Sequence, residues 1–169
     1  RYSHIQEVII QPFRPKPGTL MADQIGADDD ELKWSIAVAR IIFGPEMSIQ
    51  APPNLSPDSE IELIAAGIND FGGVSPVTPD HVNPEAPWPQ LAVLKKNTEQ
   101  ANKVLVARLP IYPRYLSAGS DWVSSSIADD LLRHVDASGL ARTDSWVPGE
   151  LTEAPFGVGQ FKKVHKGSY

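Results

Sequence analysis

Two stretches indicate how this chain folds: Met47-Ser-Ile-Gln-Ala-Pro-Pro-Asn54 and Ile68-Asn-Asp-Phe-Gly-Gly-Val-Ser-Pro-Val-Thr-Pro-Asp-His-Val-Asn-Pro-Glu85. Each begins as a short apolar β-run and ends in amide, carboxylate, glycine and proline residues. Parallel α/β proteins place their binding groups on the loops at the carboxyl ends of their strands. The two stretches therefore predict two strands whose ends share a polar rim.

Strand and helix patterns alternate outward from these stretches. Gly44-Pro45 and Gly67 follow two of the helical patterns and predict where those helices end. The expected strands are His4–Ile10, Met47–Ala51, Ile68–Val74 and a late β-run at Val104–Leu109. The expected helices are Glu31–Phe43, a segment from Ser56-Pro57 to Gly67, Trp88–Asn102 and Asp121–Asp136.

This order of elements predicts an α/β fold with parallel strands and right-handed crossovers. A complete (β/α)8 barrel needs about 250 residues, whereas this chain has 169. We therefore expect residues 1–140 to be part of a TIM-type barrel, or else an open α/β sheet. The segment 141–169 has no convincing periodicity in its tail and is interpreted as an extension or linker.

Composition narrows the possible partners. The net charge is -6, with 15 basic and 21 acidic residues and no extended basic cluster, so a duplex nucleic acid is not expected as a partner. No apolar run approaches the roughly 20 residues that span a bilayer, and no membrane association is expected. The sequence contains no cysteine, which excludes disulfides and thiolate ligands within this chain. A cytoplasmic location is the expectation.

The second stretch carries the residue types with the most chemistry. Asp80 and His81 are candidates for an acid–base pair or for metal ligands, although binding of backbone amides in its loop is the favoured role for Asp80. Asn69 and Asp70 precede Gly72-Gly73, which permits a close approach of a ligand or a positive φ angle. No phosphate-binding glycine motif accompanies them.

Side-chain amides dominate the rest of the expected rim. Gln50 and Asn54 flank Pro52-Pro53, and amides both donate and accept, as recognition of a nucleobase edge or a polyol requires. A loop-capping role is the alternative for both. The remaining candidates at the rim are Gln11 and Ser75.

Three motifs resemble the radical S-adenosylmethionine domain of the FO synthases. They are His4-Ile-Gln-Glu-Val-Ile-Ile-Gln11, Ile49-Gln-Ala-Pro-Pro-Asn-Leu55 and the long run from Gly67 to Pro89. The resemblance extends to about Tyr112. Pro12 stands where the family pattern has Asn, and Phe71 stands where it has Trp.

The resemblance implies that these are the last three strand–helix units of a radical S-adenosylmethionine barrel. Its cofactors would be a 4Fe-4S cluster, whose cysteine ligands lie outside this chain, and S-adenosylmethionine. The implied reaction forms the 8-hydroxy-5-deazaflavin chromophore from a tyrosine-derived ribityl-diaminouracil adduct, with loss of ammonia. The implied partners are the small-molecule substrate, the remaining amino-terminal part of the barrel, and the tyrosine-condensing radical S-adenosylmethionine domain or subunit.

Within that resemblance, the chain alone is expected to be inactive. Gln50, Asn54 and Asn69 would hold the uracil or ribityl group, Asp70 would pair with a hydroxyl, and Gly72-Gly73 would let a flat ring lie close. Two alternatives stay open. One is a non-catalytic half-barrel that pairs with a cysteine-bearing partner, and the other is a metal-dependent TIM-barrel hydrolase using Asp70, Asp80 and His81.

Overall fold

The computed structural model describes residues 4–116 and 121–143. The chain divides into two compact units, Arg1–Leu105 and Val106–Tyr169. The predicted boundary at residue 140 stays a prediction, and its 141–169 extension lies almost wholly outside the described residues. No helix within the described ranges is long and apolar enough to span a membrane.

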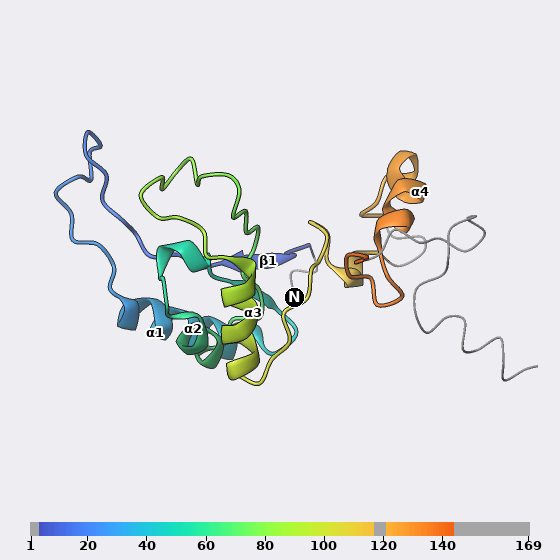
Figure 1. The fold of residues 1–169 in the computed structure, drawn as a ribbon, viewed down its shortest axis with the longest axis horizontal. Coiled ribbons are helices and arrows are strands. Elements are labelled where there is room, and N and C mark those ends of the chain that lie inside the picture. Colours follow the sequence, from blue (N-terminus) through green and yellow to red (C-terminus); the bar gives the residue numbers. More distant parts are fainter. Residues whose placement is uncertain (1–3, 117–120, 144–169) are drawn as a thin grey trace, which may run out of the picture. The chain divides into compact units, whose positions relative to one another are not determined.

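Unit 1 contains a small parallel sheet with helices on one side. Its elements in chain order are β1 (Glu7–Ile9), α1 (Asp29–Phe43), β2 (Ser48–Gln50), the 3-10 turn η1 (Pro53–Leu55), α2 (Glu60–Ala66) and α3 (Leu91–Gln100). β1 and β2 pair in parallel, with Val8 opposite Ile49. Figure 1 shows α1, α2 and α3 on the same side of β1.

The predicted third strand, Ile68–Val74, is reduced to a single parallel bridge between Gln50 and Asp70. The Asn69 N–H donates to the Ile49 carbonyl at 3.1 Å, so this segment follows β2 as a third strand would. Gly72 then adopts φ +76°, a conformation that leaves the extended region and ends the pairing. The expected parallel order is therefore present over a shorter length.

The core of unit 1 lies between β2 and the helices. Ile36 and Ile49 are fully buried, and Leu63 joins them from α2. Side chains alternate across a strand, so Ile49 faces the helices while Gln50, its neighbour, lies on the opposite face. This alternation separates the apolar core from the polar residues at the strand ends.

α1 ends at Phe43 as the sequence predicts, but it begins at Asp29, two residues before the predicted Glu31. The Asp28 side chain accepts a hydrogen bond from the Glu31 N–H at 2.8 Å, and Gly44 caps the carboxyl end through its own N–H. Asp29 and Asp30 occupy the first turn, where negative charge is favoured by the helix dipole. The predicted end of α2 at Gly67 is also confirmed.

Other element predictions were wrong in their bounds. α2 begins at Glu60 after Ser59, so Pro57 lies in the preceding turn and not in the first turn of the helix. α3 begins at Leu91, beyond Pro89, because a proline disfavours a helical conformation at the residue before it. The run 104–109 is not a strand.

Unit 2 is smaller in its described part. It contains the 3-10 turn η2 (Pro113–Tyr115), the helix α4 (Ser125–His134), and an antiparallel bridge between Val135 and Ala141. The rings of Tyr115 and Trp122 meet edge to face, with centroids 5.4 Å apart. α4 is 10 residues long and buries none of its side chains.

Candidate functional site

The carboxyl ends of the parallel strands bring Gln50, Asp70 and Gly72 together. The Asp70 Oδ1 atom accepts a hydrogen bond from the Gly72 N–H at 2.6 Å. The Gln50 side chain lies against Gly72 so closely that a Cβ there would fall 2.0 Å from Gln50 Nε2. We call these three residues the Gln50 cluster. Of the residues predicted to form the rim, these three lie close together in the structure.

The double glycine serves this cluster in a specific way. Gly72 needs its positive φ and its missing side chain because Gln50 occupies the adjacent space. Gly73 has open space around its Cα and is exposed. In this structure, then, the close approach predicted for Gly72 is made by a side chain of the protein itself.

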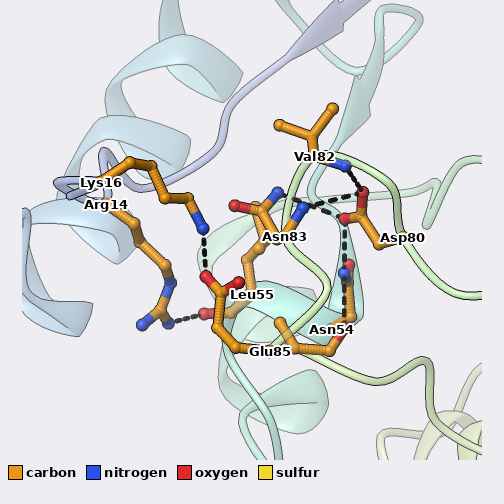
Figure 2. Close-up of polar contacts among 9 residues, drawn as sticks. Arg14, Lys16, Asn54, Leu55, Asp80, Val82, Asn83 and Glu85 are labelled. Carbon is orange, nitrogen blue, oxygen red and sulfur yellow. Dashed lines mark hydrogen bonds and ion pairs between the residues drawn. The ribbon is translucent and has the colours of Figure 1, made fainter. Parts of the chain in front are cut away.

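A second group of contacts gathers around Asp80. Asn54 Nδ2 donates to Asp80 Oδ2 at 2.9 Å, and Asn83 Nδ2 donates to the same oxygen at 3.2 Å. The other oxygen, Oδ1, accepts from the backbone N–H groups of Val82 and Asn83 at 2.9 and 3.2 Å. Figure 2 shows the carboxylate enclosed by these donors. We call Asn54, Asp80 and Asn83 the Asp80 cluster.

These donors favour the ionised carboxylate. The hydrogen bond from Asn54, followed by that from Val82, lowers the pKa of Asp80 to about 2. Such a group stays negatively charged near neutral pH and does not exchange protons there. The structural alternative for Asp80, binding of backbone amides in its loop, is confirmed.

Three loops meet at the Asp80 cluster. Arg14, from the loop after β1, donates to the Leu55 carbonyl in η1. Lys16, from the same loop, forms an ion pair with Glu85 in the loop after the third segment. Figure 2 shows both contacts beside Asn54. The loops that follow all three parallel segments are therefore tied together at one edge of unit 1.

Asn54 and Ser56 have polar atoms that no described residue satisfies. Both side chains are buried, yet neither Asn54 Oδ1 nor Ser56 Oγ has a hydrogen-bond partner among the described residues. The two N–H donors of Asn54 bond Asp80 Oδ2 and the Ala86 carbonyl, at 2.9 and 3.2 Å, which fixes the direction of its oxygen.

Asn69 belongs to a different set of contacts. Its Oδ1 atom accepts from Arg40 Nη2 at 3.0 Å and from the Ile49 N–H at 2.8 Å, while Nδ2 donates to the Met47 carbonyl at 3.3 Å. The side-chain amide is thus bound to β2 and α1. The structure does not bring it to the Gln50 cluster.

The other candidates are more loosely placed. His81 and Gln11 are exposed, and Ser75 shares a hydrogen bond with the Thr78 hydroxyl at 2.7 Å. Within residues 4–116 and 121–143, no group of three or more His, Cys, Asp or Glu side chains is arranged to hold a metal ion. The proposed set of Asp70, Asp80 and His81 is therefore not a joint metal site.

Sequence reasoning missed several of the contributing residues. Asn83 directly follows Val82, whose N–H lies two residues after Asp80 at the spacing of an Asx turn, and this signal was available. Lys16 and Glu85 lie 69 residues apart, so no local pattern indicates their pairing. Arg40 lies in a helix and gave no functional signal.

Comparison with known proteins shows which family the chain resembles in sequence. It is 48% identical over 156 residues to a protein named FO synthase from Nocardia farcinica, covering 91% of the chain. It is 43% identical over 169 residues to the FO synthase of Mycobacterium tuberculosis, covering 99% of the chain. The chain is homologous to part of FO synthase.

An archaeal relative supports the same assignment. The 7,8-didemethyl-8-hydroxy-5-deazariboflavin synthase of Methanopyrus kandleri is 46% identical over 142 residues, or 84% of the chain. The chain spans 18% of the length of the Nocardia FO synthase and 42% of the Methanopyrus protein. No family model matches the chain, and no solved structure matches it.

Proposed function

We propose that this chain is the carboxyl-terminal part of a radical S-adenosylmethionine barrel in an enzyme that synthesises the 8-hydroxy-5-deazaflavin chromophore. The observation that carries the proposal is the 43–48% identity to proteins named FO synthase or 7,8-didemethyl-8-hydroxy-5-deazariboflavin synthase. The parallel pairing of β1, β2 and the Asp70 segment supports it. Three parallel segments with helices on one side are what a part of such a barrel requires.

This chain lacks the residues that would bind one of the two expected cofactors, the 4Fe-4S cluster. The sequence contains no cysteine, so this chain supplies no thiolate to a 4Fe-4S cluster. In our proposal those ligands belong to the remainder of the full-length protein, and this chain is inactive alone. A cytoplasmic location, the tyrosine-condensing partner and the small-molecule substrate complete the proposal.

Within this proposal the Gln50 cluster contacts the substrate. Gln50 supplies a donor and an acceptor on the sheet face opposite the helices, and Asp70 supplies a negative charge beside it. Such groups orient a ribityl chain or a uracil edge, while the cofactor supplies the reactivity when it is bound. The Asp80 cluster has a supporting role, because its carboxylate is already enclosed by protein donors.

The test uses the full-length enzyme together with its condensing partner. Asp70→Asn retains an oxygen that can accept from the Gly72 N–H but removes the charge, and we expect deazaflavin formation to fall by about tenfold or more. Asp129→Asn, on the exposed surface of α4, is the matched control and should leave the rate unchanged. Product is measured by its fluorescence and mass.

Two results would overturn the proposal. One is a wild-type enzyme, supplied with both cofactors and the condensed substrate, that forms no deazaflavin. The other is an Asp70→Asn enzyme as active as the Asp129→Asn control, which would remove Asp70 from the substrate site.

A further inference from the structure

Arg40 makes more hydrogen bonds than any role in capping α1 requires. It lies in the last turn of that helix, and its guanidinium group donates to acceptors in several separate segments. These are the carbonyl oxygens of Gly44 (2.8 Å), Pro45 (3.3 Å), Met47 (2.7 Å) and Gly67 (2.8 Å), and Oδ1 of Asn69 (3.0 Å). One side chain thus joins the end of α1, the start of β2, the end of α2 and the start of the third segment.

The approach of Arg40 to Gly67 is close. Gly67 has φ +126°, and a Cβ at this position would lie 2.9 Å from the Cβ of Arg40. A side chain at residue 67 would therefore push α1 away from the end of α2. The glycine keeps the guanidinium group within reach of Asn69.

Asn69 transmits this contact to β2. The oxygen that accepts from Arg40 also accepts from the Ile49 N–H at 2.8 Å, and the Asn69 backbone N–H donates to the Ile49 carbonyl at 3.1 Å. Ile49 is therefore held by both the backbone and the side chain of one residue. This double contact fixes the register of the third segment against β2.

Register decides which side chain faces the rim. Successive side chains along a strand point to opposite faces, so a slip by one residue exchanges the positions of Asn69 and Asp70. The third segment has one bridge to β2, and a further backbone hydrogen bond runs from the Ala51 N–H to the Asp70 carbonyl at 3.3 Å. A pairing this short specifies register weakly by itself. Side-chain contacts add to it, among them the burial of Ile68 in the core.

We propose that Arg40 and Asn69 act as a positioning pair that holds Asp70 in the Gln50 cluster. The pair fixes Asn69 on Ile49, and Asp70, the next residue, is thereby placed opposite Gln50 with its carboxylate on the Gly72 N–H. This inference rests on the proposed function insofar as the Gln50 cluster contacts substrate. Neither Arg40 nor Asn69 touches the substrate in it.

The test compares two substitutions of Asn69 in the full-length enzyme. Asn69→Asp keeps an oxygen for Arg40 and for the Ile49 N–H and loses only the weaker donor to the Met47 carbonyl, at 3.3 Å, whereas Asn69→Ala removes all three contacts. We expect Asn69→Ala to accelerate amide hydrogen exchange at Ile49 and Gly72 by about tenfold without changing exchange within α1. Asn69→Asp should keep exchange at both amides close to wild type.

Steady-state kinetics supply the second readout. Asn69→Ala should raise KM for the condensed substrate by about tenfold while kcat changes less, and Asn69→Asp should restore KM. Arg40→Lys, which keeps the charge but loses the planar fork, should behave like Asn69→Ala. Arg133→Lys is the matched control, because Arg133 is exposed and its ion pair with Asp130, at 3.7 Å, is on the surface of α4.

The outcomes separate this proposal from a purely structural role. Faster exchange spread evenly over α1, β2 and Gly72, with an unchanged KM, would overturn it and make the pair a general stabiliser of unit 1. Equal effects of Asn69→Ala and Asn69→Asp would also overturn it. If the wild-type enzyme forms no deazaflavin, the proposed function fails, while the exchange measurements still decide whether the pair sets the register.

Discussion

At the scale of single residues, Asp80 shows how one carboxylate connects two loops. Its two oxygens accept hydrogen bonds from Asn54 in the loop after β2, and from Val82 and Asn83 in its own loop. Because every one of these partners is a donor, the ionised form is favoured in the folded protein. The consequence is a pH-dependent contribution to stability.

We predict that this contribution is lost in acid. The folded-state pKa of about 2 lies below the ordinary value of 3.8, so the contribution is complete above about pH 4 and disappears as the pH falls toward 2. Asp80→Asn should be less stable near neutral pH, since the new amide opposes the donors of Asn54 and Asn83. Urea unfolding of both proteins between pH 2 and 6 measures this.

The quantity to compare is the difference in unfolding free energy between the wild-type protein and Asp80→Asn. This difference should shrink as the pH falls below about 4. A difference that stays constant across the whole range would mean that the ionisation of Asp80 does not contribute to folding stability.

Gly72 and Gly73 provide a second prediction at this scale. Gly72→Ala places a Cβ on Gln50 and forces a side chain into φ +76°, so we expect it to lower the free energy of unfolding by about 1 to 3 kcal/mol. Gly73→Ala meets nothing within 4 Å and should stay within about 0.5 kcal/mol of wild type. Equal losses in chemical unfolding would contradict this assignment.

At the scale of elements, α1 organises unit 1. Its buried side packs Leu32, Ile36 and Ala39 against β2 and α2. Its other side exposes apolar residues, including Trp34 at 67% and Ile41 at 81%. The helix is therefore more apolar than the described residues can cover.

The two sides of α1 should respond differently to truncation. Ile36 is 0% exposed, and Ile36→Ala should cost about 2 to 5 kcal/mol of unfolding free energy. Ile41→Ala removes the same atoms from an exposed position and should change stability by about 0.5 kcal/mol or less. Thermal or urea unfolding of the two variants checks this. A large loss of unfolding free energy from Ile41→Ala would show that the Ile41 side chain is buried in solution.

At the scale of the whole molecule, exposed apolar side chains are the main feature. Trp34, Ile41 and Ile42 are exposed on α1, and Leu132 is exposed on α4. Large exposed apolar patches mark interaction surfaces or aggregation liabilities. The Nocardia and Methanopyrus relatives, of which the chain spans 18% and 42%, have further segments that could cover such side chains in those proteins.

We therefore predict that the 169-residue chain, when produced alone, self-associates as its concentration rises. Ile41→Lys combined with Trp34→Lys should shift the association to higher concentration, because the two charges disfavour burial of α1. Sedimentation velocity over a concentration series measures this. A compact monomer at every concentration would contradict the prediction.

The predictability of the site differed between residues. Gln50, Asp70 and Gly72 were predicted together because each lies at the end of a β-run, and parallel strand ends meet at one edge. Asn69 was assigned to the same edge because it precedes Asp70 in sequence. Its side chain points away, since alternation along the strand separates neighbours.

By itself, the sequence determined the carboxyl end of α1, the end of α2, the parallel order of the three β-runs and the relationship to FO synthase. These depend on local signals, namely terminal glycines, apolar periodicity and sequence motifs. Tertiary structure alone decided the contact between Arg40 and Asn69, the ion pair of Lys16 with Glu85, and the position of Gln50 over Gly72. Each of these depends on contacts between residues distant in the chain, whose geometry no local pattern encodes.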